Sequence, residues 1–157
     1  MFNSFPNAIA SGVVCANAGI DRSNSGGINL VTLLPENPDG SAKEIREKIK
    51  LLSGVDIGVI ISDTHGRPFR NGAINIALGI SGFKNGILSY VDKKDLFNYK
   101  LETTIVNIVD ELASAAELVM GESNEAIPVV LIRGYNFEIG NDTSKSLIRE
   151  KQFDLFR

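Results

Sequence analysis

The chain is organised around the stretch Asp56-Ile57-Gly58-Val59-Ile60-Ile61-Ser62-Asp63-Thr64-His65-Gly66-Arg67-Pro68-Phe69-Arg70. Its apolar run from Gly58 to Ile61 is bounded by turn-forming residues and predicts a short buried strand. The apolar pattern stops at Ser62, so we expect residues Ser62 to His65 to lie in a loop at the end of that strand. A rigid strand that ends in a polar loop is a common place for binding and catalytic side chains.

Two arginines follow this loop and are candidates for a substrate anion clamp. Arg67 and Arg70 carry guanidinium groups, which pair well with phosphate and carboxylate oxygens. His65 is the only histidine of the chain, and it is a candidate general base or metal ligand. The alternative interpretation is an Asx-turn at Asp63, with solvated arginines and a histidine that serves only packing.

Composition limits the class of protein. With 157 residues, the chain is long enough for one domain spanning residues 1–157, of which we expect 1–10 to be irregular. The net charge of -3 argues against nucleic acid or an anionic membrane as a partner. Cys15 is the only cysteine. No internal disulfide is therefore expected, a reducing, cytoplasmic location is predicted, and Cys15 itself is expected in the core.

Hydropathy patterns predict more strands than helices. No apolar run is long enough to span a membrane, and no secretory signal opens the chain. One helix is expected from a capping box at Ser41 and Glu44 to Ser53, and a longer one from about Lys100 to Met120, followed by Gly121. A short helix is expected near 146–152. Strands are expected at 12–18, 28–34, 58–61, 74–80, 87–91 and 127–132, with a hairpin turn at 84–86 that pairs the fourth with the fifth. Because strands and helices do not alternate regularly, the pattern predicts an α+β fold with a mainly antiparallel sheet and two principal helices, not a doubly wound parallel sheet.

Two aspartates stand in similar positions in the sequence. Asp21 and Asp63 each follow an apolar run and begin a segment that contains Ser or Thr. If the two strands are neighbours, both carboxylates converge at one end of the sheet, and such oxygen ligands suit Mg²⁺ or Mn²⁺. The alternative is a pair of ordinary turn aspartates. A zinc site is not expected, because there is no second histidine or cysteine, and neither Gly-x-Gly-x-x-Gly nor P-loop spacing occurs.

Taken together as sequence motifs, several segments of the chain resemble one protein family. The matching phrases are Cys15-Ala16-Asn17-Ala18-Gly19-Ile20-Asp21-Arg22-Ser23-Asn24, the stretch from Gly54 to Arg70, Asp110 to Gly121, and the closing Leu147-Ile148-Arg149 with Asp154-Leu155-Phe156-Arg157. In this order and spacing, from about Ser11 to the end, they resemble the coenzyme F420-0:L-glutamate ligases, also called gamma-glutamyl ligases.

The resemblance implies an activity, a site and an assembly. Ligases of this family use GTP and a divalent metal to join L-glutamate, through a gamma-linked amide and an acyl phosphate, to the deazaflavin coenzyme F420 precursor. The implied metal ligands are Asp21, Asp63 and Thr64, and Asn24 is an implied GTP contact. A further implied GTP-binding stretch consists of Gly121, Glu122, Ser123, Asn124, Glu125, Ala126, Ile127 and Pro128. The family fold is α+β, and it forms an intertwined homodimer with the site near the subunit interface.

Two departures from the family pattern shape our expectations. Family members are longer at the N-terminus, where they carry other GTP-binding segments, so we expect this chain alone to bind metal weakly and to ligate poorly. His65 stands where the family usually has an aromatic residue. The alternatives to a ligase are a non-catalytic metal- or ligand-binding domain and a metal-dependent phosphohydrolase, which would release phosphate without needing glutamate.

Overall fold

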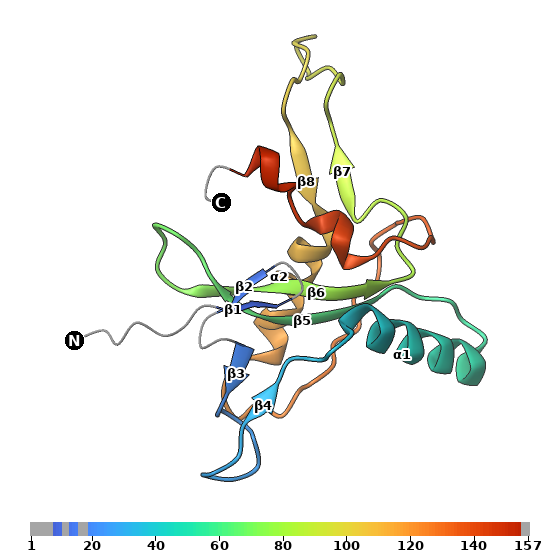
Figure 1. The fold of residues 1–157 in the computed structure, drawn as a ribbon. Helices are drawn as coiled ribbons and strands as arrows, with labels where there is room; N and C mark the ends of the chain where they lie inside the picture. Colours follow the sequence, from blue (N-terminus) through green and yellow to red (C-terminus); the bar gives the residue numbers. More distant parts are fainter. Residues whose placement is uncertain (1–7, 11–12, 16–18, 155–157) are drawn as a thin grey trace.

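The computed structural model describes residues 8–10, 13–15 and 19–154 (Figure 1). The fold is α+β with two principal helices, as predicted. Its strands form four separate two-stranded antiparallel pairs, β1–β2, β3–β4, β5–β6 and β7–β8, in place of one sheet. The elements are β1 (Ala8–Ala10), β2 (Val13–Cys15), β3 (Ile20–Asp21), β4 (Thr32–Leu33), α1 (Pro38–Ser53), β5 (Val59–Gly66), β6 (Ala73–Ser81), β7 (Ile87–Ser89), β8 (Ile105–Asn107), α2 (Ile108–Met120) and the 3-10 helices η2 (Ser144–Leu147) and η3 (Lys151–Phe153).

The hairpin of β5 and β6 is the centre of the molecule. Its register runs from Val59 opposite Ser81 to Gly66 opposite Ala73, with a bulge at Ile61/Ser62. Strand β5 therefore continues through Asp63, Thr64 and His65, and the prediction that these residues lie in a loop is wrong. The reason is that β6 extends far enough to offer ladder partners opposite all three, which local sequence does not reveal.

Helix α1 begins earlier than predicted. The side chain of Asn37 accepts a hydrogen bond from the Gly40 amide (2.9 Å), and Pro38 occupies the first turn, so the capping box at Ser41 is not the start. The helix ends at Gly54, with φ of 73°, as predicted. Ala42 of this helix is fully buried, whereas Leu52 near its end is exposed.

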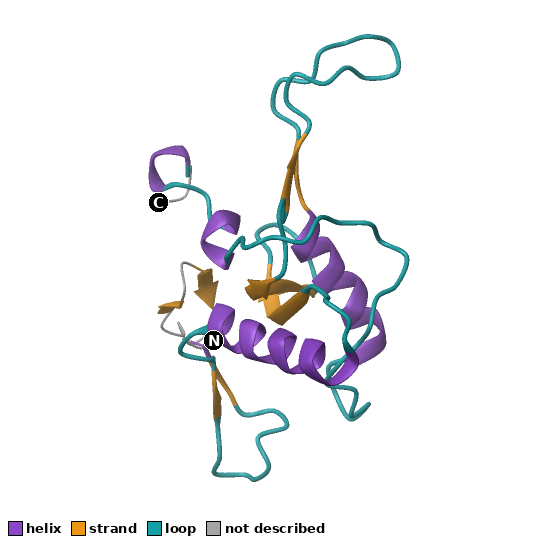
Figure 2. Ribbon diagram, turned by 90° about the vertical axis from the view of Figure 1, so that its right-hand side faces the viewer, coloured by secondary structure: helices purple, strands orange, loops and turns teal. Residues whose placement is uncertain are grey.

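Helix α2 begins later than predicted. Asn107 caps it, accepting a hydrogen bond from the Asp110 amide (3.2 Å), and the residues just before it form β8 rather than helix. Strand β8 pairs with β7, so β7 does not return along β6 as the hairpin signal at 84–86 suggested. The β7–β8 pair extends from the body as an arm, and the β3–β4 pair extends at the opposite end (Figures 1 and 2).

Carboxylates of the two helices occupy the free edge of β6. Asp110 of α2 accepts a hydrogen bond from the Ala77 amide (2.8 Å), and Asp39 of α1 accepts one from the Ile80 amide (2.8 Å). Unpaired strand amides invite a further strand, and these contacts satisfy them without one. Strand β7 is thereby left to pair with β8.

A small hydrophobic core lies between β6 and the helices, which flank the β5–β6 pair in Figure 2. Both α1 and α2 pack against β6. The buried side chains are Ala77, Ile80, Phe83 and Val109, with Ile60, Leu112 and Leu147 packed around them.

Several other predicted elements differ from those in the structure. The strand predicted at 127–132 is wrong, because the segment has no regular structure and Ile127, Val129 and Leu131 are exposed. The strand at 28–34 shrinks to β4, and the short helix near 146–152 is replaced by η2 and η3. Of the strand at 12–18, Val13–Cys15 is present as β2, and the remainder, like the Cys15 side chain, lies outside the described residues. Residues 8–10 form β1 where irregular chain was expected.

Among the helices described, not one combines the length and the apolar character needed to cross a membrane.

Candidate functional site

Asp21 ends β3 and its side chain closes a tight turn. Its Oδ1 accepts a hydrogen bond from the Ser23 amide (2.8 Å), and its Oδ2 accepts one from the Ser23 hydroxyl (2.6 Å). These bonds, the side-chain one above all, lower the pKa of the Asp21 carboxyl. Asp21 is thus a turn aspartate, whereas the Asx-turn considered for Asp63 is not formed, because Asp63 lies within strand β5. The exposed Asp21 carboxylate still has lone pairs free for a ligand, because each oxygen accepts more than one bond.

Asp63 lies in β5 and is half-buried. Burial raises the pKa of its carboxyl, and the negative charges of Asp21 and Glu122 raise it further. The carboxylates of Asp21 and Glu122, which belong to two other segments, thus act electrostatically on Asp63. Because β3 and β5 belong to different sheets, the two aspartates approach across the fold, not at the end of one sheet as predicted.

The segment after α2 contacts both of the other predicted segments. The Thr64 hydroxyl donates a hydrogen bond to Glu122 Oε1 (2.6 Å). The side-chain amide of Asn24 donates one to the Ser123 carbonyl oxygen (3.0 Å). Residues that are 58 and 99 positions apart in sequence thus lie together, and Thr64 and Asn24 both contact the segment that follows α2.

The rest of that segment forms an exposed coil. Gly121 ends α2 with φ of 68°, as expected for the glycine that follows the helix. The Glu125 carboxylate accepts a hydrogen bond from the Ser123 amide (2.9 Å), which folds the turn back on itself. Residues Asn124, Ala126, Ile127 and Pro128 continue as exposed chain. Only the first half of the predicted segment is therefore drawn into contact with Thr64 and Asn24.

The two arginines lie beyond β5, in the loop of residues 67–72 that leads to β6. Arg70 is exposed. The Nε atom of Arg67 is buried and has no hydrogen-bond partner in the part of the chain that the structure describes. His65 is half-buried in β5 and lies opposite Ile74 of β6. It therefore belongs to the central hairpin, not to a free loop.

The donor atoms at this site fit a hard divalent cation. Asp21, Asp63 and Thr64 offer only oxygen, and Glu122 lies against Thr64. Mg²⁺ typically takes one or two carboxylates and completes its shell with water and phosphate oxygens. Among the described residues, no group of three or more His, Cys, Asp or Glu side chains forms a metal cage by itself. The donor set thus suits a cation shared with a phosphate-bearing ligand.

Asn75 is a site residue that sequence reasoning missed. It lies opposite Thr64 in β6, and its side-chain Oδ1 is 3.4 Å from the Thr64 hydroxyl oxygen, whose single proton is shared with the closer Glu122 (2.6 Å). The backbone carbonyl oxygen of Asn75 accepts a hydrogen bond from the Ser114 hydroxyl (2.8 Å), which anchors α2 to this end of the hairpin. At this position the sequence predicted only a strand over 74–80.

Two cavities lie elsewhere on the molecule. One of about 310 Å³ is lined by Phe83, Leu88, Tyr135 and Phe137 among others, and one of about 650 Å³ lies beside α1. Neither is lined by any of the predicted site residues.

Comparison with known proteins identifies similar chains. Residues 8–134 match the family model described as F420-0:Gamma-glutamyl ligase. Similar curated proteins are each named coenzyme F420:L-glutamate ligase. The one from Methanocaldococcus jannaschii is 53% identical over 149 residues, covering 93% of this chain and 57% of its own length. The one from Methanothermobacter thermautotrophicus is 47% identical over 148 residues (93% and 58%), and the one from Methanopyrus kandleri is 45% identical over 153 residues (95% and 60%). The chain thus spans less than two thirds of the length of these relatives.

Proposed function

Because the chain belongs to the F420-0:gamma-glutamyl ligase family, we propose that it supplies the metal- and nucleotide-binding part of an enzyme that joins L-glutamate to the deazaflavin coenzyme F420 precursor. The observation that carries this proposal is the meeting of three distant segments, through the Thr64–Glu122 and Asn24–Ser123 hydrogen bonds. Such an arrangement suits a substrate that spans a cation and a nucleotide.

Joining a carboxylate to an amine requires activation of the carboxylate. In the proposed reaction a carboxylate oxygen of the precursor attacks the γ-phosphorus of GTP, and GDP leaves. The amine of L-glutamate then attacks the resulting acyl phosphate, loses a proton and displaces phosphate. Most of the rate in such transfers comes from positioning and from stabilising charge.

Each part of the site has a role in this proposal. Asp21, Asp63 and the Thr64 hydroxyl would hold Mg²⁺ or Mn²⁺, which would neutralise phosphate charge when bound. Asn24 and the segment from Gly121 to Pro128 would hold GTP. The Arg67 and Arg70 guanidinium groups clamp an anionic group of the acceptor or of glutamate.

The hydrogen bonds within the site orient the side chains that would contact the ligands. Glu122 fixes the Thr64 hydroxyl (2.6 Å) and adds negative charge beside Asp63. Asn24 is fixed against the Ser123 carbonyl oxygen (3.0 Å). These contacts hold donors from three segments in one arrangement before a ligand arrives, which lowers the entropy cost of binding.

The test is a product assay with the chain as it is. The protein, at concentrations similar to those of the substrates, is incubated with GTP, Mg²⁺ or Mn²⁺, L-glutamate and the precursor. We expect phosphate release that depends on both glutamate and precursor, and a product heavier by one glutamyl group in mass spectrometry. Asp63→Asn should reduce the yield, and Asp92→Asn, an exposed aspartate on the β7–β8 arm, should not. Phosphate release that is independent of glutamate would favour a phosphohydrolase instead.

A further inference from the structure

The loop between β5 and β6 holds an aromatic ring out into solvent. Phe69 is 98% exposed, and its backbone φ is +58°. The left-handed region is unfavourable for a residue with a bulky side chain. A phenyl ring that is fully exposed to water also forgoes the favourable free energy that its burial would provide. A residue that combines both costs points to a role outside the packing of this chain.

The two arginines flank this ring in sequence. Arg70 follows Phe69 and is exposed, and the Arg67 Nε atom is shielded from solvent without a hydrogen-bond partner in the described ranges. A buried donor that lacks an acceptor is costly, and an anionic ligand would satisfy it. The loop thus offers an aromatic face and two guanidinium groups within residues 67–70.

The geometry of the hairpin keeps these groups together. Gly66 pairs with Ala73, so the ends of the loop are neighbours, and the loop extends no more than about 10 Å beyond them. This is the size of a fused tricyclic ring. In Figure 1 the loop lies at the left end of the β5–β6 pair, clear of both helices. Asp63 and Thr64 lie a few residues earlier on the same strand.

We propose that Phe69 is a stacking platform for the planar ring of the deazaflavin precursor, and that Arg67 and Arg70 hold the anionic tail of that molecule. The ligand class is a fused heteroaromatic ring that carries phosphate or carboxylate groups. Aromatic faces stack on such rings, and guanidinium groups pair with such anions. This inference rests on the proposed function.

The order of groups along the site favours the precursor over the guanine of GTP. The proposed nucleotide contacts, Asn24 and Ser123, lie together and are joined to β5 through Thr64 and the adjacent Glu122. The loop lies farther along β5, beyond Thr64. Nucleotide, cation and acceptor ring would then follow one another, which is the order that transfer of a γ-phosphoryl group to the acceptor requires.

The experiment measures binding and needs no turnover. The chain is titrated against the precursor while the fluorescence intensity and anisotropy of the deazaflavin ring are recorded, without GTP or glutamate. We expect Phe69→Ala to weaken binding about tenfold, the size typical of one lost stacking contact. Phe69→Tyr should bind like the unaltered chain. Phe153→Ala removes another exposed ring, 64% exposed in η3, and should leave binding of the precursor unchanged.

Three outcomes would overturn the inference. The first is that Phe69→Ala binds the precursor as tightly as the unaltered chain. The second is that the unaltered chain does not bind the precursor at all. The third is that the substitution weakens GTP binding and spares binding of the precursor. Unchanged melting temperatures would show that the variants fold. Failure of the proposed function is seen separately, as absence of the glutamylated product despite normal binding of the precursor.

Discussion

At the scale of single residues, the two aspartates of the candidate site differ in how far neighbouring groups stabilise the negative charge of each carboxylate. Asp21 is stabilised as an anion by Ser23, whereas burial and neighbouring carboxylates disfavour the anion at Asp63. Asp63 is therefore the residue that would gain most from a nearby cation. Elsewhere, charges are paired within the chain, as at Asp56 beside α1.

The first prediction concerns Asp63. Asp63→Asn removes a formal negative charge from an all-oxygen donor set, so the affinity for Mn²⁺ should fall at least about tenfold. Isothermal titration calorimetry with the metal alone measures this. Asp92→Asn is the matched control, because Asp92 pairs with Lys100 on the arm. An unchanged Mn²⁺ affinity in Asp63→Asn would remove this residue from the metal site.

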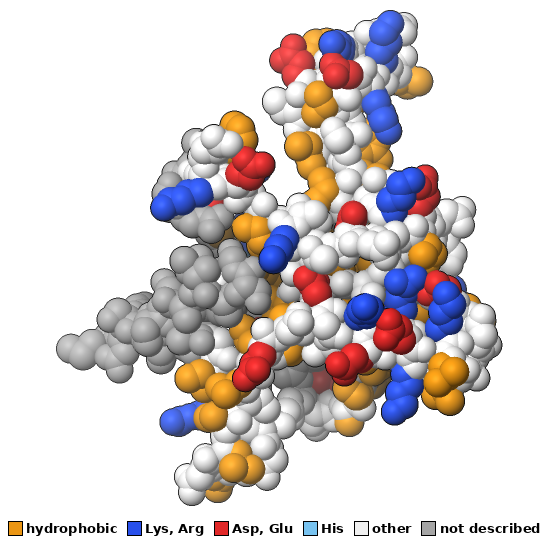
Figure 3. Space-filling model, turned by 45° about the vertical axis from the view of Figure 1, so that its right-hand side comes forward, with side chains coloured by type: hydrophobic (Ala, Val, Ile, Leu, Met, Phe, Trp, Pro, Cys, Tyr) orange, Lys and Arg blue, Asp and Glu red, His pale blue; other side chains and the backbone are white. Residues whose placement is uncertain are grey.

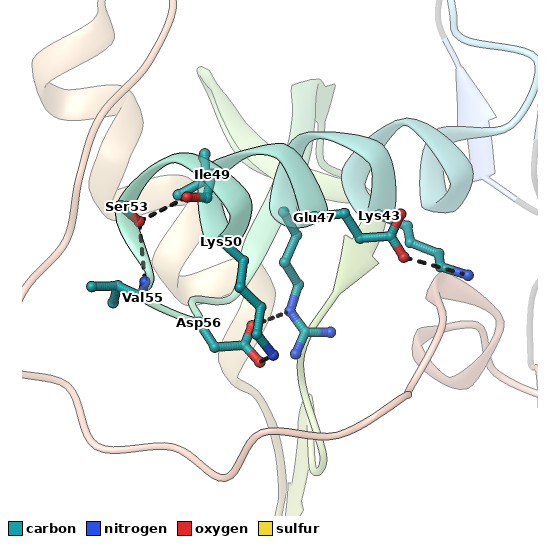
Figure 4. Close-up of polar contacts among 8 residues, drawn as sticks. Lys43, Glu47, Ile49, Lys50, Ser53, Val55 and Asp56 are labelled. Atoms are coloured by element: carbon teal, nitrogen blue, oxygen red, sulfur yellow. Dashed lines mark hydrogen bonds and ion pairs between the residues drawn. The ribbon is translucent and has the colours of Figure 1, made fainter.

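The second prediction concerns the pH dependence of stability at Asp56. Arg46 Nε and Lys50 Nζ donate hydrogen bonds to its carboxylate (2.7 and 2.8 Å). Figure 4 shows Asp56 and Lys50 together beside α1. The bond from Arg46 and then that from Lys50 lower the pKa of Asp56. The stability it contributes is therefore present above the unfolded-state pKa near 3.8, and it is lost as pH falls through the lower, folded-state pKa.

Asp56→Asn should accordingly lower the melting temperature at neutral pH. The difference from the unaltered chain should shrink as the pH is lowered below about 3.8. Thermal melts followed by circular dichroism at a series of pH values measure this. A difference that stays constant down to strongly acidic pH would mean that ionisation of Asp56 is not its cause.

At the scale of elements, close packing of α1 on β6 sets the position of the central hairpin. At Gly79 an added Cβ would lie 2.2 Å from the Pro38 carbonyl carbon, so only glycine permits this approach. The Asp39 contact to Ile80 lies beside it, and Asp39 also accepts hydrogen bonds from Ser144 of η2. The start of α1 thereby joins β6 to the C-terminal part of the chain.

The third prediction follows from that contact. Gly79→Ala should destabilise the fold by about 1–3 kcal/mol, because a methyl group against backbone forces α1 and β6 apart. Gly66→Ala is the matched control in the same hairpin, since no atom lies within 4 Å of a Cβ placed there. Urea unfolding curves of both variants measure the difference. Equal midpoints would show that α1 shifts freely on β6.

At the scale of the whole molecule, much apolar surface is uncovered. Exposed hydrophobic side chains line the β7–β8 arm and the coil after α2, and Figure 3 shows those of the arm interspersed with charges. The exposed residues include Leu96, Phe97, Tyr99, Val129 and Leu131. Exposed patches of this kind usually mark contacts with another chain or segment.

The fourth prediction is that the chain forms a homodimer, which remains our proposal from the family resemblance and from this surface. Light scattering should give twice the mass of one chain, and Leu131→Asp should lower the dimer fraction because a charge would be buried. Glu36→Asp, at an exposed acidic position, serves as control. A monomer at all concentrations would contradict the proposal.

The amino-acid sequence by itself determined the family, the fold class and the approximate position of the two helices. Gly54 and Gly121 ended those helices as expected, because the end of a helix depends on local backbone preference. The candidate site residues were also named from the sequence, because they lie in motifs that resemble those of the family and have side chains suited to binding metal or nucleotide. Local chemistry and resemblance were sufficient for these conclusions.

Only the tertiary structure decided the strand partners and the meeting of the site segments. Nothing local distinguishes a β7 that returns along β6 from one that pairs with β8, since the choice depends on Asp39 and Asp110 occupying the β6 edge. The coil at 127–132 has the composition of a buried strand but finds no partner strand among the described residues. The contacts of Thr64 with Glu122 and of Asn24 with Ser123 likewise join residues far apart in sequence. Pairing and convergence are long-range, because a strand or carboxylate is stabilised only by what the rest of the chain brings beside it.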